Sequence, residues 1–121
     1  MKRYVLRDVA TGAALGAVAR ADSPWERLVG LLGCACVQPH DGLWIEPCAA
    51  VHTVGMRCAL DLIFLDRDCR VVALREAVKP NRLAVFAPGA RVTIELGAGS
   101  LRAGLVRLGD VLRLEESALP S

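Results

Sequence analysis

The segment Val51–Asp66, VHTVGMRCALDLIFLD, decides the fold expected for this chain of 121 residues. Within it, the run LDLIFL begins at Leu60 and is apolar at every position except Asp61. Neighbouring side chains of a strand point to opposite faces of a sheet, so both faces of this strand are largely apolar. A strand of this kind is typical of the centre of a sheet that is covered on both sides. Asp61 is then a buried carboxylate that needs a partner. We expect Arg57, Arg27 or backbone amides of a neighbouring loop to provide one.

Further strands are predicted on either side of this segment. Alternating apolar residues bounded by Gly, Pro, Asn or Asp predict strands over Tyr4–Val9, Ala13–Ala19, Leu43–Ile45, Val51–Met56, Leu60–Leu65, Arg70–Leu74, Arg91–Leu96 and Val111–Leu114. A turn at Thr11–Gly12 makes roughly the first 22 residues an N-terminal hairpin. A second turn at Asp66–Asp68 joins two central strands into an antiparallel hairpin.

Two short helices complete the expected fold. Ser23 and Pro24 are typical of a helix start, which predicts a helix over Trp25–Leu32. A glycine loop leads into the second predicted helix, Leu101–Leu108, which Gly109 closes. Parallel sheets need crossover connections of roughly a dozen residues, which are largely missing here. We therefore expect a single α+β domain over residues 1–121, with a mainly antiparallel, curled or barrel-like sheet, two short helices and a frayed tail at 117–121.

Composition and charge exclude several classes of protein. Hydrophobic residues make up 54% of the chain and the net charge is +2, with arginines scattered among acidic residues. Nucleic-acid binding needs clustered positive charge, so no nucleic-acid partner is expected. No run reaches the roughly 20 apolar residues of a membrane helix, and Arg7 and Asp8 interrupt the beginning of the chain. We expect a soluble, cytoplasmic protein whose five cysteines are reduced.

Short pieces of the sequence occur in an order typical of one family. They are Arg27–Leu32 (RLVGLL), Asp41–Trp44 (DGLW), His52–Arg57 (HTVGMR), Leu60–Leu65 (LDLIFL), Val71–Val72, Glu95–Gly99 (ELGAG) and Gly109–Asp110. On these pieces the chain resembles the uncharacterised family number 192 of the domains of unknown function. The resemblance implies a compact, mainly antiparallel α+β domain and no assigned reaction.

Three residues with soft donor atoms are candidate metal ligands. Cys48, His52 and Met56 are ligand types suited to copper(I) or zinc. On one continuous strand they share a face, but Cys48 and His52 then lie about 13 Å apart, at ~3.3 Å per residue, too far for one metal. Only a turn after Pro47 brings them together, and Cys34–Cys36 lacks the usual CxxC spacing. We expect no metal and no other cofactor, with a zinc or copper protein as an alternative.

Catalysis and phosphate binding are two further alternatives. His52 and Asp61 can form an imidazole–carboxylate pair, with Cys48 or Cys58 as the candidate nucleophile. Arg57 can lower the thiol pKa of its neighbour Cys58. The sequence contains no nucleophile elbow and no known cysteine-enzyme signature. The glycine loop Gly97–Ser100 resembles a phosphate-binding turn, but the fingerprint requires glycine or alanine where Arg102 stands.

Polar residues set in the apolar central segment are the favoured binding cluster. The expected members are His52, Thr53, Met56, Arg57 and Asp61, joined by Arg27, Glu95 and Asp110 from other elements. Polar groups that converge on an apolar surface are typical of ligand sites. We therefore expect a non-enzymatic accessory module that binds a small ligand or a protein, as a monomer or weak homodimer. A small enzyme that uses His52 and Asp61 is the main alternative.

Overall fold

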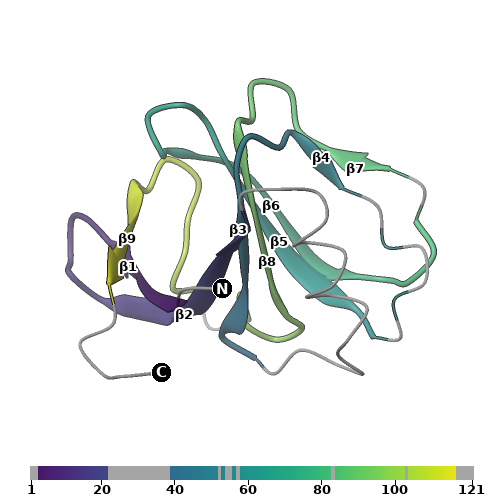
Figure 1. Ribbon diagram of the computed structural model, residues 1–121, viewed down its shortest axis with the longest axis horizontal. Helices are drawn as coiled ribbons and strands as arrows, with labels where there is room; N and C mark the ends of the chain where they lie inside the picture. Colours follow the sequence, from purple (N-terminus) through teal and green to yellow (C-terminus); the bar gives the residue numbers. More distant parts are fainter. Residues whose placement is uncertain are drawn as a thin grey trace.

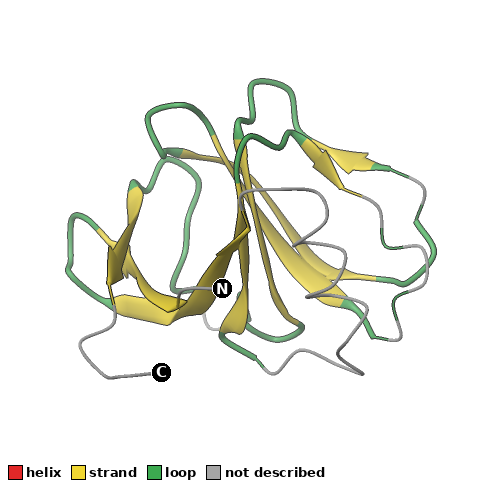
Figure 2. Cartoon of the chain, viewed as in Figure 1, coloured by secondary structure: helices red, strands yellow, loops and turns green. Residues whose placement is uncertain are grey.

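Strands and their connecting loops make up the described part of the chain, residues 3–21, 39–51, 53, 56, 58–82, 84–102 and 104–116 of a computed structural model (Figures 1 and 2). The strands are β1 (Arg3–Asp8), β2 (Ala14–Ala21), β3 (Asp41–Ile45), β4 (Ala50–Val51), β5 (Leu60–Leu65), β6 (Val71–Val78), β7 (Val85–Phe86), β8 (Val92–Gly97) and β9 (Leu112–Glu116). The described residues contain no helix, and so none that has the length and apolar character to cross a membrane.

One large sheet dominates the structure. Its strand order is β6-β5-β8-β3-β2-β1-β9, and β4 pairs with β7 in a separate two-stranded ribbon (Figure 1). β2 and β3 run parallel, whereas all other neighbours are antiparallel. The sheet is open, with β6 and β9 at its edges. These edges touch where Arg70 and Val111 form an isolated bridge and Leu112 N donates to Cys69 O (3.0 Å). We call this contact the β6–β9 junction.

The sheet has two faces, each with its own apolar core. The Asp61 face carries the larger core, which includes Val18, Trp44, Ile63, Leu65, Ile94 and Leu96. The Glu95 face carries Leu60, Leu62 and Phe64 in one cluster and Ala19, Leu43 and Ile45 in another. All six residues of β5 are buried. The prediction that this strand is covered on both sides is therefore confirmed, but its place in the sheet is next to the edge strand β6 rather than at the centre.

The expected α+β class is wrong, because the described chain is all-β and its sheet is open rather than closed. The predicted helix over Leu101–Leu108 is absent, and turns take its place. Gly104, in the middle of the predicted helix, has a φ angle of 68°. This left-handed conformation interrupts a right-handed helix. The other predicted helix, Trp25–Leu32, lies outside the described residues.

The strand predicted over Val51–Met56 is also wrong, because β4 ends at Val51. Beyond that point the backbone turns towards the loop that follows β6. Thr53 N donates to Arg82 O (3.0 Å), and Met56 N donates to Thr53 O (3.1 Å). These bonds replace the ladder of a strand. Alternation of apolar residues does not reveal them, because they depend on a partner loop distant in sequence.

Candidate functional site

Glu95 lies at the centre of the Glu95 face. The register places it between Leu62 of β5 and Leu43 of β3. The same row continues to Arg75 on β6 and to Ala19 on β2. Glu95 is 1% exposed. The register neighbours of this carboxylate are thus apolar, and the row ends in an exposed arginine at the sheet edge.

Met56 and Cys48 span β8 on this face. Both pack against the apolar cluster of β5 and against that of β3, and β8 runs between these two strands. Cys48 is held in place because its N–H donates to Arg91 O (2.7 Å) and its carbonyl accepts from Thr93 Oγ1 (3.1 Å). The flexible thioether of Met56 adapts to the shape of a neighbour. An adaptable side chain and a fixed one therefore lie beside the row that holds Glu95.

Thr53 holds the loop that carries Met56. Its hydroxyl donates to Lys79 O (2.7 Å) and accepts from Arg82 N (2.8 Å). Its carbonyl accepts from Asn81 N (2.9 Å) and Met56 N (3.1 Å). Thr53 is 1% exposed, and its hydroxyl is engaged by the protein itself. The structure therefore makes Thr53 a residue that positions Met56.

Asp61 faces away from Glu95. It pairs with Leu96 across β8, whereas Leu62 pairs with Glu95, so the two carboxylates point to opposite sides of the sheet. Asp61 Oδ1 accepts from Ala77 N (2.8 Å) and Oδ2 accepts from Leu101 N (2.9 Å). Of the partners expected from the sequence, backbone amides are the ones observed. Asp61 thereby ties the end of β6 and the loop after β8 to the centre of the sheet.

The other predicted site residues do not join Glu95 in the described structure. Asp110 lies at the β6–β9 junction, where its Oδ2 accepts from Arg107 N (2.8 Å) and its carbonyl accepts from Val71 N (2.8 Å). Val71 pairs with Leu65, four residues along β5 from Asp61, so Asp110 is distant from both buried carboxylates. Three further members of the cluster lie outside the described residues: Arg27, His52 and Arg57.

The cysteines are in different chemical states. Cys58 is disulfide-bonded, whereas Cys48 and Cys69 are free thiols, and Cys34 and Cys36 lie outside the described residues. The expectation that all five are reduced is therefore wrong, because pairing depends on proximity in the fold rather than on spacing in the sequence. Cys58 has no thiol to act as a nucleophile in this state.

Cys69 is a poor nucleophile as well. Burial raises the pKa of its thiol, and the nearby carboxylates of Glu46, Asp66 and Asp68 raise it further. A higher pKa lowers the fraction of reactive thiolate at neutral pH. In the described part of the chain, no group of three or more His, Cys, Asp and Glu side chains is arranged to hold a metal.

The carboxylate of Asp61 binds the backbone directly after the glycine loop Gly97–Ser100. Leu101 N, directly after the loop, donates to the carboxylate of Asp61. Ser100 Oγ donates to Gly97 O (2.6 Å) and accepts from His40 N (2.7 Å). The loop is not followed by a helix, so it lacks the aligned N-terminal amides of a phosphate site. The phosphate hypothesis predicts that backbone amides here bind an anionic ligand. In the structure, one of these amides binds the carboxylate of Asp61 instead.

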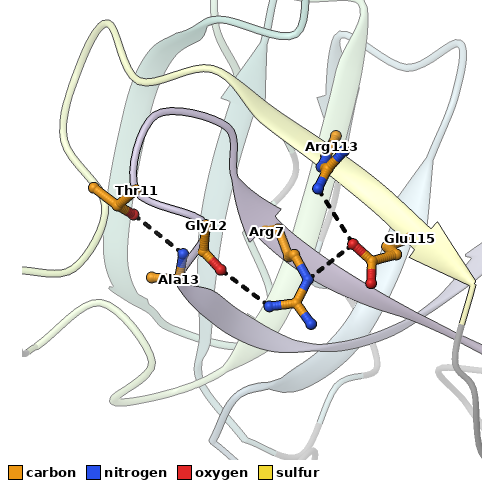
Figure 3. Close-up of polar contacts among 6 residues, drawn as sticks. All are labelled: Arg7, Thr11, Gly12, Ala13, Arg113 and Glu115. Atoms are coloured by element: carbon orange, nitrogen blue, oxygen red, sulfur yellow. Dashed lines mark hydrogen bonds and ion pairs between the residues drawn. The ribbon is translucent and has the colours of Figure 1, made fainter.

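A polar network on the outer strands was not foreseen from the sequence (Figure 3). Arg7 Nε donates to Glu115 Oε2 (2.9 Å) and its Nη1 donates to Gly12 O (3.0 Å), while Arg113 contacts the same carboxylate at 3.3 Å. Arg7 and Arg113 are register partners on β1 and β9, so Glu115 offsets their like charges. These groups are largely exposed, and the network stabilises a strand pair rather than forming a site.

The fold and the site define a class: an all-β domain whose central strands bury one carboxylate on each face. The model of the family DUF192, described as Uncharacterized ACR, matches residues 7–114, and the chain belongs to this family. The resemblance seen in the sequence is thus confirmed. No curated protein matches the chain.

Two solved structures are similar over nearly the whole chain. A putative transcription regulator from Sinorhizobium meliloti 1021 has a TM-score of 0.76 and 21% identity, covering 93% of this chain and 92% of that one. A protein of unknown function from Novosphingobium aromaticivorans DSM 12444 has a TM-score of 0.71 and 20% identity, covering 92% and 83%. At these identities the similarity concerns the fold alone.

Proposed function

We propose that this domain is a non-enzymatic binding module that holds a small ligand against the Glu95 face. The observation that carries the proposal is the position of Glu95, a 1% exposed carboxylate between Leu62 and Leu43. Ligand sites are mostly apolar and contain a few polar groups that fix orientation. This face has that composition, and Met56 adds a side chain that adapts to an occupant.

The carboxylate of Glu95 decides which ligands fit. An ionised carboxylate accepts hydrogen bonds and donates none, and charged donors bind it more strongly than neutral ones. The neighbouring Leu62, Leu43 and Phe64 favour an apolar body. The matching ligand class is a small amphipathic molecule that has an ammonium, amidinium or guanidinium group on an aliphatic or aromatic skeleton.

A binding role fits the surroundings of Asp61 better than catalysis does. In the alternative enzyme, Asp61 orients or activates His52. In the described residues Asp61 has a structural role, since Oδ1 accepts from Ala77 N and Oδ2 accepts from Leu101 N. These two bonds hold the end of β6 and the loop after β8 on the sheet.

The similar structure from Sinorhizobium meliloti is described as a putative transcription regulator. We do not extend that role to this chain, because DNA binding depends on clustered positive charge. Five arginines are offset by carboxylates: Arg3 by Asp41, Arg20 and Arg91 by Glu46, and Arg7 and Arg113 by Glu115.

We also propose that the module works in an oxidising compartment, and the disulfide at Cys58 supports this. Disulfides persist in oxidising compartments and are rare in the cytoplasm, where thiols are kept reduced. The disulfide at Cys58 favours an oxidising setting over the cytoplasmic one expected from the sequence. Fractionation of the native host with an antibody to the domain tests this, and recovery from the reducing cytoplasm alone would contradict it.

Thermal-shift measurements test the ligand proposal. The probes are a panel of alkyl- and arylamines, amidines and guanidines, each paired with the neutral alcohol of the same skeleton. Ligands that prefer the folded state raise its melting midpoint. We expect some cationic probes to raise the midpoint more than their alcohols do, and Glu95→Gln to abolish that difference. Glu115→Gln, an exposed carboxylate on β9, is the matched control and should behave as the unmodified protein.

Two results would overturn this proposal. One is the absence of any midpoint increase across the cationic panel at millimolar probe concentration. The other is a midpoint increase that Glu95→Gln leaves unchanged, because the ligand then binds elsewhere on the domain. Circular dichroism of Glu95→Gln without ligand checks that the variant retains its fold.

A further inference from the structure

Ala77, near the end of β6, has a backbone conformation that is unusual for alanine. Its φ angle is 51°, in the left-handed region that favours glycine. The register of β5 with β6 shifts between Leu60 and Leu62, so one extra residue of β6 lies there. A bulge of this kind bends the strand that carries it. Residues other than glycine keep such a conformation only where their surroundings impose it.

Asp61 stabilises this conformation of Ala77. Its Oδ1 atom accepts from Ala77 N (2.8 Å), so this N–H bonds to a side chain of the neighbouring strand β5. Its Oδ2 atom accepts from Leu101 N (2.9 Å), which holds the carboxylate in place from a second segment. Asp61 is 1% exposed, and a charged acceptor bonds more strongly than a neutral one. The bend at the end of β6 therefore depends on a buried carboxylate.

The residues that follow the bend make their contacts on the opposite face of the sheet. Val78 packs against the apolar cluster of β5 there. Lys79 O accepts from the hydroxyl of Thr53 (2.7 Å), and Thr53 O accepts from Met56 N (3.1 Å). Met56 packs against the apolar clusters on both sides of β8. A continuous series of bonded residues thus leads from Asp61 on one face to Met56 on the other.

We infer that Asp61 is a positioning residue for the Glu95 face. By stabilising the left-handed Ala77, it determines where the end of β6 meets Thr53, and so where Met56 lies. The inference rests on the proposed function in one respect, because the place of Met56 matters to a ligand only if that face binds one. Asp61 does not touch the ligand, since its side chain points to the other side of the sheet.

Substitutions at Ala77 test the inference, because they change the backbone preference of one exposed residue. Ala77→Val should disturb the bend, since a β-branched residue is strongly disfavoured at positive φ. Ala77→Gly is the matched control, because glycine adopts this conformation without strain. NMR of methyl-labelled methionine follows Met56, because the chain contains one other methionine, Met1. Ala77→Val should shift or broaden the Met56 signal, and Ala77→Gly should leave it unchanged.

Asp8 provides a matched control for the carboxylate itself. It is 5% exposed, and its Oδ1 atom accepts from Ala10 N (2.8 Å) and Thr11 N (3.3 Å) after β1. Asp61→Ala and Asp8→Ala therefore each remove a buried acceptor of two backbone amides. Asp61→Ala should shift the Met56 signal, whereas Asp8→Ala should not. Circular dichroism checks that both variants are folded, and where Asp61→Ala is not, the substitutions at position 77 decide.

Ligand binding separates this inference from the proposed function. The probe is a cationic member of the thermal-shift panel that raises the midpoint of the unmodified protein. Ala77→Val should bind it about threefold more weakly or worse in a titration, whereas Ala77→Gly should bind it like the unmodified protein. If no probe raises the midpoint, the proposed function fails, whereas the Met56 signal still tests the link from Asp61.

Three outcomes would overturn the inference. The first is a Met56 signal that Ala77→Val leaves unchanged, although Thr53→Val, which removes the hydroxyl bonded to Lys79 O, shifts it. The second is an equal shift in Ala77→Val and Ala77→Gly, because the backbone conformation is then not the cause. The third is unchanged binding of the probe in Ala77→Val despite a shifted signal, because the place of Met56 then does not affect the ligand.

Discussion

Asp61 and Glu95 are both buried carboxylates, but their surroundings give them different roles. Asp61 accepts two backbone N–H groups from segments that are distant in sequence, at 2.8 and 2.9 Å. Glu95 lies between Leu62 and Leu43 on the opposite face, where Met56 and Cys48 pack against the apolar clusters. At the scale of single residues, the first carboxylate organises the fold and the second is the one proposed to meet a ligand.

Replacing Asp61 should therefore destabilise the domain strongly. In Asp61→Asn the amide nitrogen faces a backbone N–H, so a donor meets a donor and one buried amide loses its acceptor. We expect a loss of about 2–4 kcal/mol in the free energy of unfolding, measured by urea denaturation. Asp110→Asn is the control, because Asp110 accepts one bond near the surface and should lose about 1 kcal/mol. Equal losses in the two variants would contradict the role given to Asp61.

Individual residues were predictable where one element alone decides their surroundings. The sequence indicated a buried Asp61 with amide partners among the candidates, because an acidic residue in LDLIFL must be compensated. It did not reveal that Asp61 and Glu95 point to opposite faces of the sheet, because this depends on the register between their strands. Leu43, Leu62 and Thr93 were not foreseen as site residues, as they look like ordinary strand residues in the sequence.

At the scale of elements, the pairing of β3 with β8 determines the shape of the Glu95 face. β3 approaches β8 closely at Gly42, where a Cβ atom would collide with the carbonyl of Glu95. Gly42 lies opposite Leu96 in the register, directly beside Glu95. A glycine is therefore required there by the backbone of the neighbouring strand, and the position of Glu95 depends on it.

Gly42→Ala should separate β3 from β8 and lower stability. The obstructing atom belongs to the backbone and cannot move aside as a flexible side chain would, so we expect a loss of about 2–4 kcal/mol in chemical denaturation. Gly89→Ala is the control: its φ is +81° but its Cβ meets no atom within 4 Å, and strain there should cost about 1 kcal/mol. A loss in Gly42→Ala no larger than in Gly89→Ala would contradict the close approach.

Elements differ in how well the sequence predicts them. β5 and β8 were predictable, because each is a short apolar run bounded by turn residues. The prediction of a helix over Leu101–Leu108 is wrong, because Gly104 has a left-handed conformation and Leu101 and Val106 reach the core from a series of turns. β4 is shorter than expected because Thr53 bonds to the loop after β6 instead of continuing a ladder.

The strand order is the feature of the whole molecule that local patterns did not reveal. Antiparallel hairpins are local, but β3 pairs in parallel with β2 and then with β8, far along the chain. This order places β8 between β3 and β5, which brings Glu95 between Leu43 and Leu62. The same order separates Asp61 and Asp110 from that face. Most members of the predicted cluster are close in sequence, whereas the neighbours of Glu95 come from separate strands.

The disulfide at Cys58 is a constraint on the whole molecule and gives a final prediction. Five cysteines with Cys58 paired leave three free thiols per denatured, unreduced chain, and reduction should raise this number to five by thiol titration. Disulfides stabilise chiefly by restricting the unfolded chain, typically by about 2–4 kcal/mol. A reductant should therefore lower the melting midpoint of the unmodified protein and leave that of Cys58→Ser unchanged. Five titratable thiols before reduction would contradict the disulfide. An equal effect of reductant on both proteins would also contradict it, because Cys48 and Cys69 are free thiols.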